Sequence, residues 1–418
     1  MAANPGPAPQ AARIAQVANF YGPQSGGLRT TVDMLGRGYV AAGFERVLIV
    51  PGERDADEST SAGRRITLRA PLVPGGGGYR FLPDWRRVAR VLDDLGVDRL
   101  EVSDKLTLWP LGPWATRRDI PAVLLSHERL DAILAPRLPG WASGSLLASG
   151  ADRCNRRLAD AFPTVVAASS FSCEEWYRVG ADNVVRVPLG VDLATFRPHL
   201  APVGATWDGG SWRGQAGERP NRGATNGSVA TRPLFPAKRV ADLVCVGRLS
   251  KEKRPDLAIG TLRELRDAGV PARLTMVGAG PEAARLAALA AGLPVQFTGH
   301  LTNRLAVAGL LAQADAVLAP CPVEAFGLSV LEALACGTPV VTPNRGAACE
   351  LLTTGCGAAA APRASALAAA VATVLGWRRA STRLATRRRA EQYPWDATVA
   401  AMLAAHRLGS PAAVAECG

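Results

Sequence analysis

Two long stretches of the chain alternate short apolar segments with amphipathic ones, and this alternation restricts the possible folds more than any other feature. In the first stretch, the apolar segments RIAQVANF, ERVLIVPG and AVLLSHE are separated by helix-like segments such as DWRRVARVLDDLG. The second stretch repeats the pattern with ADLVCVGRL, ARLTMVGAG and AVLAPCP. Strands that alternate with helices indicate parallel, doubly wound sheets. We therefore expect an α/β fold with two Rossmann-like domains.

The two stretches are separated by residues 200–236, which are rich in Gly, Arg, Asn and Pro and show no apolar period. This composition predicts a flexible linker that carries an insertion. We expect a disordered leader over residues 1–11, a first domain over 12–195 and a second over 237–393. The 418 residues suffice for two domains of roughly 150–200 residues each. Ligands of such folds bind beyond the carboxyl ends of the strands, so we expect the site in a cleft between the two sheets.

The composition limits the partners and the compartment. A formal net charge of +12 suits anionic partners, namely nucleotide phosphates, nucleic acid or an acidic membrane surface, although a GC-rich genome would produce part of the same bias. The eight cysteines form no C-x-x-C pair, which favours free thiols in a reducing cytosol. No window holds about 18 uncharged apolar residues, and the N-terminus lacks a signal-peptide pattern. Any membrane contact should be peripheral.

The strongest local signal is CPVEAFGLSVLEALACGTPVV, residues 321–341. A strand ends just before it, a loop with Glu324 follows, and a helix begins. Backbone N–H groups from Phe326 to Ser329, together with the helix dipole, would form an anion site suited to a diphosphate. Glu324 and Glu332 could accept hydrogen bonds from sugar hydroxyls, with solvated helix-end charges as the alternative. A glycosidase pair is disfavoured, because eight helical positions separate two residues by ~12 Å along the axis, more than the two carboxyl groups of a glycosidase need.

A pair of cations occurs in VGRLSKEKRPDLAI, residues 246–259. Arg248 follows a strand, and Lys253 lies in the turn before the next helix. Two cations at the carboxyl end of a strand can neutralise a diphosphate leaving group. Taken alone, they could be solvated loop cations, and their place beside the predicted anion site favours the binding role.

Glycines follow two of the predicted strands. In YGPQSGGLRT, Gly26 and Gly27 would let the backbone pass close to a phosphate or a sugar, and Gly278 in VGAGP stands in a similar place. Neither segment completes G-x-G-x-x-G, so a dehydrogenase-type site is not indicated. A tight turn is the alternative for both segments.

His127 in LLSHERL ends a strand and could contact a transferred sugar, with a structural histidine as the alternative. Asp55 and Asp57 form the D-x-D pattern of metal-dependent transferases. They lie in what we expect to be a polar loop without neighbouring ligands, so we interpret the pattern as a coincidence and expect no metal site.

The segment YRFLPDWRRVARVLDDLG predicts a basic amphipathic helix that could lie on an anionic membrane. The residues expected at the membrane are Arg80, Trp85, Arg86, Arg87 and Arg90. The Arg-rich segment WRRASTRLATRRRAEQ, residues 377–392, is a weaker candidate, and a solvated helix face is the alternative for both segments. Neither interleaves aromatic residues as a base-stacking platform would, so we expect no nucleic-acid partner.

Taken together, these motifs resemble the large family of retaining glycosyltransferases with the GT-B fold, glycosyltransferase family 4, which includes glycogen synthase-like and sucrose synthase-like enzymes. The resemblance runs from Arg13 to about Leu403, apart from residues 200–236. It rests on Glu324 and Glu332 as the E-x7-E element and on VPLGVD before the linker. QYPWDATVAAML resembles the C-terminal helix, about residues 394–410, that returns to the first domain in this family.

The resemblance implies roles for the motif residues. It places the donor diphosphate at Arg248 and Lys253, the sugar at Glu324 and His127, and the ribose at Glu332. The nucleotide base would lie beside residues 300–303. The expected donor-binding residues are Gly26, Gly27, Arg248, Lys253, Gly278, His300, Leu301, Asn303, Glu324, Phe326, Gly327, Leu328, Ser329 and Glu332. The expected catalytic residues are His127, Arg248, Lys253 and Glu324.

A closer resemblance is carried by ANFYGPQSGGLRT, LEVSDKLTL, SHERLD and VPLGVDLATF. These segments are similar to those of actinobacterial α-mannosyltransferases that add the third mannose to phosphatidylinositol mannosides from GDP-mannose. This similarity implies a nucleotide-sugar donor, a glycolipid acceptor, no metal or other cofactor, and a location at the cytoplasmic face of the plasma membrane. A transferase that uses a UDP-sugar on another acceptor, a nucleotide-sugar epimerase of the same fold and a non-catalytic binding protein are the alternatives.

Overall fold

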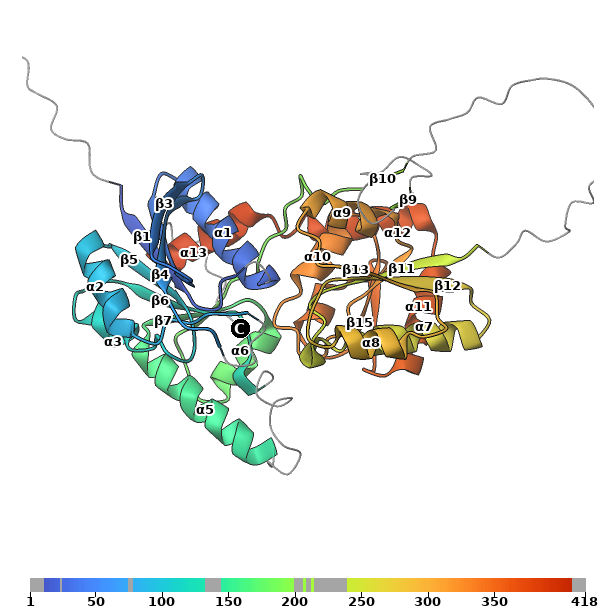
Figure 1. Ribbon diagram of the computed structural model, residues 1–418, viewed down its shortest axis with the longest axis horizontal. Helices are drawn as coiled ribbons and strands as arrows, with labels where there is room; N and C mark the ends of the chain where they lie inside the picture. Colours follow the sequence, from blue (N-terminus) through green and yellow to red (C-terminus); the bar gives the residue numbers. More distant parts are fainter. Residues whose placement is uncertain are drawn as a thin grey trace, which may run out of the picture.

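The structure, a computed structural model, consists of two lobes that each contain one sheet with helices on both faces (Figure 1). It describes residues 11–22, 25–73, 78–131, 144–198, 206–207, 212–213 and 239–407. Residues 1–10 of the predicted leader and most of the predicted insertion therefore lie outside the described residues. Within the insertion, β9 (Thr206–Trp207) and β10 (Trp212–Arg213) form an antiparallel pair. The predicted α/β fold with two Rossmann-like domains is confirmed.

The first lobe, here called the N-lobe, has the strand order β3-β4-β2-β1-β5-β6-β7-β8 among the described residues. Neighbouring strands are parallel except β3 and β4. The central strands are buried along nearly their whole length, as expected for parallel strands with helices on both faces. The strands are β1 (Arg13–Ala18), β2 (Glu45–Gly52), β3 (Ala56–Thr60), β4 (Gly63–Arg69), β5 (Arg99–Ser103), β6 (Ala122–Ser126), β7 (Thr164–Ala167) and β8 (Val184–Arg186).

Two layers of helices cover the N-lobe sheet (Figure 1). One face packs against α2 (Trp85–Leu95), α3 (Leu111–Thr116), α5 (Gly144–Ala161) and α6 (Ser170–Tyr177), and the other packs against α1 (Gly26–Ala41) and α13 (Trp395–Ala405). Local signals fix several helix ends. The Asp84 side chain accepts hydrogen bonds from the first N–H groups of α2, and Gly96 ends that helix in the left-handed conformation. Ser169 caps α6 in the same way.

The second lobe, the C-lobe, has the parallel strand order β13-β12-β11-β14-β15-β16. The order reverses between β11 and β14, and ligands of such sheets bind beyond the carboxyl ends of the strands at this reversal. The strands are β11 (Ala241–Val246), β12 (Ala272–Val277), β13 (Val295–Gly299), β14 (Ala316–Leu318), β15 (Val340–Pro343) and β16 (Gly357–Ala360). The helices are α7 (Pro255–Asp267), α8 (Ala283–Leu289), α9 (Arg304–Gln313), α10 (Leu328–Ala335), α11 (Ala364–Leu375) and α12 (Arg379–Ala390), with short 3₁₀ turns η2 (Lys251–Lys253) and η3 (Ala347–Leu351).

The chain returns to the N-lobe at its C-terminal end. Val191, before the second lobe, pairs with Pro394, just after it. The helix α13 then packs against α1, and the Thr398 hydroxyl donates to the carbonyl oxygen of Pro188 at 2.9 Å. A Cβ on Gly190 would lie 2.5 Å from the Cα of Trp395, so only glycine allows the two crossing segments to approach this closely. The two lobes are therefore joined by two adjacent segments of chain.

Two features of the N-lobe were not predicted from the sequence. The strands β3 and β4 form an antiparallel hairpin at the edge of the sheet, so the loop expected around Asp57 is wrong, because Asp57 lies in β3. All of β3 but its first residue is exposed, and it therefore shows no apolar alternation. The helix α5 was also missed, because small and polar residues break its apolar period.

Candidate active site

The carboxyl ends of the β11 and β14 strands bring a cation and a carboxylate together. Lys253, at the end of η2, donates through Nζ to both carboxylate oxygens of Glu324 at 3.0 and 2.9 Å. Burial by itself would lower the pKa of Lys253, but the charge of the Glu324 carboxylate outweighs burial and holds that pKa above its usual value. The structure thus places a permanently charged ammonium group beside the loop that leads into α10.

Arg248 follows β11 as predicted, but its side chain reaches into the other lobe. Its Nη2 donates a hydrogen bond to the hydroxyl of Tyr79, and its guanidinium lies 4.8 Å from the centroid of the Tyr79 ring. Burial raises the pKa of the Tyr79 hydroxyl, and the positive charge of Arg248 opposes that rise. Arg248 is therefore positioned by the N-lobe, whereas Lys253 is positioned by Glu324. Tyr79 is a site residue that the sequence analysis missed, although it directly follows a run of four glycines.

The anion site predicted from the sequence would lie at the start of α10. Gly327 precedes the helix with a φ of 103°, a left-handed conformation that favours glycine. The first N–H groups of a helix have no intrahelical partner, so those of Leu328 and Ser329 can bind an anion. A Cβ on Gly27 would lie 3.9 Å from Cδ1 of Leu328, whereas a Cβ on Gly26 would meet open space. The first turn of α1, which begins at Gly26, therefore faces the first turn of α10.

The loop between β14 and α10, residues 319–327 and called here the β14–α10 loop, is fixed by the N-lobe. The hydroxyls of Ser169 and Ser172 both lie within hydrogen-bond distance of the carbonyl oxygen of Ala325, at 2.6 and 2.7 Å. The next residue, Phe326, is buried, and its ring packs edge-on against Tyr393 with 6.4 Å between the ring centroids. The sequence analysis missed both serines, whose only signal was their place at the carboxyl end of a predicted strand.

Glu332 lies one turn into α10 and is partly buried. Burial raises the pKa of its carboxyl group to about 7, while Arg304, 3.7 Å away, lowers it and Asp192 adds to the rise. Arg304 also lies 3.6 Å from Asp192. Asp192 belongs to the segment that leaves the N-lobe, so Arg304 connects the predicted ribose-binding residue to the junction between the lobes. No sequence motif marked Arg304.

Four other residues that were predicted to bind the nucleotide-sugar donor lie at the ends of β12 and β13. The side chain of Asn303 caps α9 by accepting a hydrogen bond from the Leu305 N–H at 2.9 Å. His300 is exposed, and Leu301 packs against the core of the C-lobe. Gly278 has a structural reason for being glycine, because a Cβ there would lie 1.9 Å from the carbonyl oxygen of Gly247.

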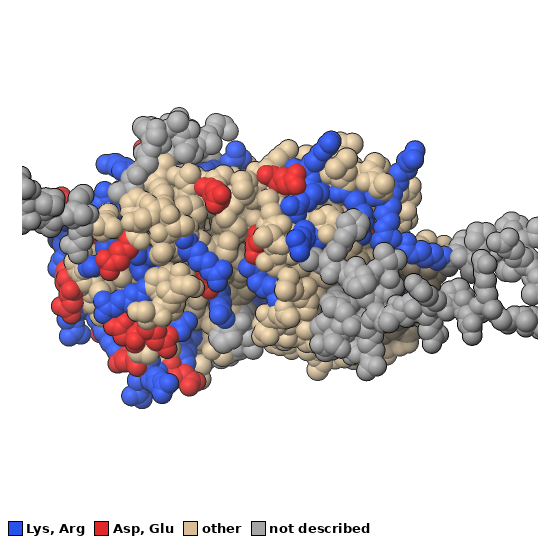
Figure 2. Space-filling view, turned by 90° about the horizontal axis from the view of Figure 1, so that it is seen from above, with Lys and Arg blue, Asp and Glu red and all other residues tan. Residues whose placement is uncertain are grey.

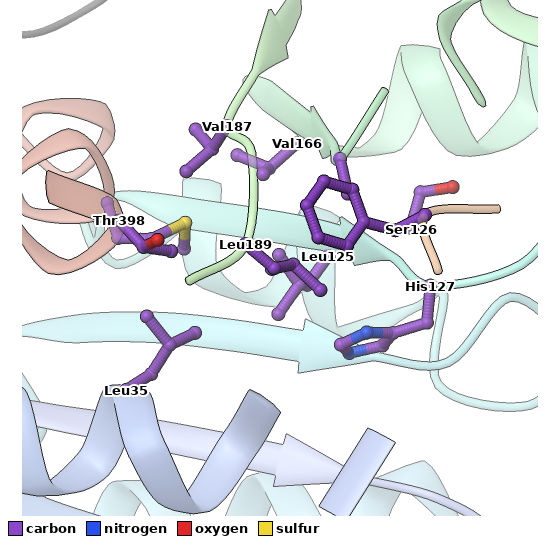
Figure 3. Close-up of a pocket in the computed structure, with 11 residues that line it drawn as sticks. Leu35, Leu125, Ser126, His127, Val166, Val187, Leu189 and Thr398 are labelled. Atoms are coloured by element: carbon purple, nitrogen blue, oxygen red, sulfur yellow. The ribbon is translucent and has the colours of Figure 1, made fainter. Parts of the chain in front are cut away.

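His127 follows β6 and faces the C-lobe across a small apolar cavity of about 20 Å³. Figure 3 shows its ring turned toward the cavity and the Ser126 side chain pointing the other way, with Leu35 of α1 and Thr398 of α13 at the opposite end. Phe326 of the C-lobe also lines this cavity. Burial lowers the pKa of His127 to about 4, and its Nε2 lies 3.0 Å from the Ser103 hydroxyl. The imidazole is therefore neutral at pH 7 and can serve a polar ligand as a hydrogen-bonding group.

Two family models match the chain, one over each lobe. Residues 25–195 match Glycosyltransferase Family 4, and residues 241–376 match Glycosyl transferases group 1. The chain is 45% identical to a GDP-mannose-dependent alpha-(1-6)-phosphatidylinositol dimannoside mannosyltransferase of Mycobacterium tuberculosis (strain ATCC 25177 / H37Ra), over 97% of this chain and 98% of that protein. The chain belongs to glycosyltransferase family 4. The predicted enzyme class, a glycosyltransferase, is confirmed.

More distant relatives of this glycosyltransferase support the same fold. A glycogen synthase of Mycobacterium tuberculosis (strain CDC 1551 / Oshkosh) is 32% identical over 76% of this chain and 72% of that protein. Sucrose-phosphate synthase from Thermosynechococcus elongatus matches the structure with a TM-score of 0.71 at 19% identity, covering 95% of this chain and 98% of that chain. A glycosyltransferase involved in lipopolysaccharide biosynthesis matches with a TM-score of 0.63 at 17% identity, covering 94% of this chain and 99% of that chain. The predicted GT-B arrangement is confirmed.

Both carboxylates of the D-x-D pair in this glycosyltransferase form ion pairs with arginines. Asp55 accepts from Nη2 of Arg87 at 2.6 Å, and Asp57 forms a bidentate pair with Arg64 at 2.9 and 2.6 Å. In the part of the chain that the structure describes, no three His, Cys, Asp or Glu side chains form a group that could hold a metal ion.

The membrane residues predicted on and beside α2 fall into two groups. Arg80 pairs with Glu53 at 3.1 Å and Arg87 pairs with Asp55, so both are held by acidic residues of their own lobe. Arg86 and Arg90 are exposed, and the Arg86 guanidinium lies 5.1 Å from the centroid of the half-buried Trp85 ring. Figure 2 shows basic and acidic side chains intermixed over the N-lobe. Among the described helices, none is long and apolar enough to cross a bilayer.

The second basic segment, α12, directs several of its arginines toward the protein. Arg383 donates to the carbonyl oxygens of Ala312 and Cys336, at the ends of α9 and α10. Arg387 donates to carbonyl oxygens of Phe196 at 2.9 Å and Ala335 at 3.1 Å. Cations stabilise the carboxyl ends of helices, so these arginines have a structural role and the weaker membrane interpretation loses its main support.

Proposed function

We propose that this glycosyltransferase transfers mannose from GDP-mannose to a phosphatidylinositol dimannoside, adding the third mannose with retained anomeric configuration at the cytoplasmic face of the membrane. The main support is the 45% identity to the mycobacterial dimannoside mannosyltransferase. The similarity extends over 97% of this chain and therefore includes both lobes. The same relative supports a nucleotide-sugar donor and a glycolipid acceptor as partners.

On the donor side, the diphosphate lies between Lys253, Arg248 and the first N–H groups of α10. Negative charge accumulates on the diphosphate as the bond to the sugar breaks. Fixed cations and helix N–H groups stabilise that charge more in the transition state than in the ground state, which lowers the barrier. In this proposal Arg248 exchanges the Tyr79 hydroxyl for a phosphate oxygen when the donor binds. No metal ion is required, because these groups carry the electrostatic stabilisation.

On the sugar side, Glu324 and His127 bind the hydroxyls of the transferred mannose. Glu324 accepts hydrogen bonds and is held in place by Lys253. His127 is neutral because burial lowers its pKa to about 4, so it can hydrogen-bond a hydroxyl without adding a positive charge beside the forming oxocarbenium ion. We assign the ribose to Glu332 and the base to residues 300–303. The departing phosphate takes the proton of the acceptor hydroxyl on the same face of the sugar, which accounts for retention.

The membrane contact of this proposal is made by α2. Trp85, Arg86 and Arg90 supply an aromatic side chain and two exposed cations on one helix. Each cation near an anionic leaflet contributes ~1 kcal/mol of binding free energy. Arg80 and Arg87 contribute less, since acidic residues of the N-lobe already neutralise them.

The decisive experiment incubates the purified protein with GDP-[¹⁴C]mannose and phosphatidylinositol dimannoside in anionic vesicles. We expect a labelled trimannoside whose new linkage is α by NMR, and equal turnover in EDTA. UDP-sugars in place of GDP-mannose should give no product. A β linkage would reject retention, and loss of activity in EDTA that Mn²⁺ restores would reject metal independence. Release of free mannose or of an epimerised sugar nucleotide, without labelled lipid, would reject the transferase assignment.

A further inference from the structure

The β14–α10 loop is anchored from both lobes at two consecutive carbonyl groups. The buried hydroxyls of Ser169 and Ser172 in the N-lobe lie 2.6 and 2.7 Å from the carbonyl oxygen of Ala325. From the C-lobe, the Ala347 N–H in η3 donates to the carbonyl oxygen of Glu324 at 2.8 Å. The Glu324 carbonyl is therefore held from within the C-lobe, whereas the partners of the Ala325 carbonyl come from the N-lobe and reach it only when the lobes are in contact.

A carboxylate of the C-lobe completes the contact. Glu350 in η3 accepts hydrogen bonds from the N–H groups of Ser170 and Phe171, at 3.0 and 2.7 Å. These are among the N–H groups that α6 cannot satisfy itself, and a carboxylate at that end also interacts favourably with the helix dipole. The Ser169 side chain accepts a hydrogen bond from the next N–H group of the helix, that of Ser172, at 3.0 Å. The start of α6 is fully satisfied when the C-lobe lies against it.

We propose that Ser169, Ser172 and Glu350 are positioning residues that give the β14–α10 loop its active geometry, so that donor chemistry depends on contact between the lobes. This inference rests on the proposed function, because it assumes that Glu324 and the first N–H groups of α10 bind the donor. We call the contact made by these three residues the serine clasp.

The physical link between the clasp and the donor is short. Peptide groups are planar and trans, so fixing the carbonyl groups of Glu324 and Ala325 also fixes the directions of the N–H groups in the same two peptide units, those of Ala325 and Phe326. Only Gly327 separates Phe326 from the start of α10. Without the two serine hydroxyls, the buried Ala325 carbonyl would lack these partners and the loop would rotate toward others. The Glu324 carboxylate and the helix N–H groups would then miss the donor.

The kinetic consequence differs from that of a simple packing contact. In the proposed function, Lys253, Glu332 and residues 300–303 also bind GDP and do not contact the serines, so the affinity for GDP should depend on the serines much less than transfer does. The barrier for transfer depends on donor groups placed to within about 1 Å, where misplacement costs about 10²-fold. The clasp should therefore affect kcat far more than the affinity for GDP.

The test compares Ser169→Ala plus Ser172→Ala with the matched variant Ser170→Ala. Ser170 lies in the same turn but is exposed, and its hydroxyl accepts from Arg186 at 2.8 Å. For the double variant we expect kcat to fall about 10- to 100-fold while the Kd for GDP changes by less than about threefold. Glu350→Gln, which removes the charge but keeps one acceptor oxygen, should have a smaller effect in the same direction. Ser170→Ala should behave as the wild type.

A second readout does not depend on turnover. In the double variant, amide hydrogen exchange of residues 326–331 should accelerate, whereas exchange in β1 and β6 of the N-lobe core should stay unchanged. Unchanged kcat together with unchanged exchange at 326–331 would overturn the inference. Loss of GDP affinity and of N-lobe protection in parallel with kcat would overturn it in favour of a purely structural contact. If the wild type transfers no mannose, the proposed function fails, and the exchange experiment still decides whether the serines hold the loop.

Discussion

Lys253 lies where the carboxyl end of β11 meets the β14–α10 loop, and both oxygens of Glu324 accept hydrogen bonds from its ammonium group. Replacing Lys253 with Ala removes a preorganised positive charge from the diphosphate and leaves Glu324 without its partner. We expect kcat to fall by ~10²–10³, the effect of removing one transition-state charge partner. Steady-state kinetics with GDP-mannose measure this change.

Lys251 provides the control for that substitution. It lies two residues earlier in the same 3₁₀ turn and is exposed. Lys251→Ala removes the same charge from the protein without touching Glu324, so its kcat should equal that of the wild type. Equal turnover of both variants would contradict the role given to Lys253.

We expect Glu332 to give donor binding a pH dependence close to neutrality. Burial raises its pKa to about 7, against the opposing charge of Arg304. Below that pH the carboxyl group is protonated and loses its charge, so it accepts hydrogen bonds from ribose hydroxyls less well. We therefore expect the affinity for GDP to weaken as the pH falls through 7. Calorimetric titration between pH 6 and 8 measures the change.

Glu332→Gln separates this effect from protonation of GDP itself. The amide keeps the shape of the side chain but does not titrate, so the variant should bind GDP more weakly at pH 8 and lose the part of the pH dependence that belongs to the carboxyl group. A pH profile identical to that of the wild type would show that Glu332 does not contact the nucleotide.

Individual site residues differ in how far the sequence could predict them. Glu324 and Lys253 were predictable because each follows a strand, and parallel strands bring their carboxyl ends to one edge. Tyr79, Ser169 and Arg304 were not, because each acts through a partner distant in the sequence. The contact of Arg248 with Tyr79 joins residues of different lobes, which no local pattern can reveal.

At the scale of elements, the membrane contact proposed for α2 depends on which of its arginines are exposed. Arg86 and Arg90 are exposed, so reversing both with Arg86→Glu plus Arg90→Glu should weaken binding to anionic vesicles. With each nearby cation worth ~1 kcal/mol, the double reversal should lower the partition coefficient at least about tenfold. Vesicle sedimentation at several salt concentrations measures it.

The matched control reverses two exposed arginines of the other lobe, Arg378 and Arg388. Arg378→Glu plus Arg388→Glu changes the net charge by the same amount but leaves α2 intact, so it should bind vesicles nearly as well as the wild type. If both double variants bind equally, net charge rather than α2 mediates the attraction.

Buried strands were easier to predict from the sequence than exposed ones. Buried parallel strands such as β11 and β6 form continuous apolar runs, which makes them visible without a structure. The β3–β4 hairpin lies at the edge of the sheet, where the exposed ADEST of β3 has no apolar face. In α12 the basic composition suggested a membrane surface, whereas Arg383 and Arg387 donate to carbonyl groups at the ends of other helices. The composition of a segment predicts its exposure to solvent, but it cannot show which groups a long cationic side chain contacts.

At the scale of the whole molecule, the C-terminal helix α13 is tied to the N-lobe through a buried polar network. His406 Nε2 lies 2.9 Å from Oε1 of Glu101. Glu101 also accepts hydrogen bonds from Gln16 at 2.7 Å and from the hydroxyl of Tyr39. Burial would raise the pKa of Glu101, but these hydrogen bonds and the adjacent His406 outweigh it and lower that pKa. The carboxylate therefore stays ionised inside the lobe and depends on its donors.

Because the network is buried, removing one member should destabilise the N-lobe as a unit. His406→Ala leaves the buried Glu101 carboxylate short of one donor, which costs ~1–3 kcal/mol. Core amides of β1, β5 and β6 should then exchange faster by the factor that this free energy implies. Those of β11 and β14 in the C-lobe should not change, because the two sheets pack in separate core clusters and we expect each lobe to open as its own cooperative unit. The exposed His300 is the control, and His300→Ala should leave both lobes unchanged within about 0.5 kcal/mol. Equal acceleration in both lobes after His406→Ala would mean that the lobes open together, and the two crossing segments would then join them into one folding unit.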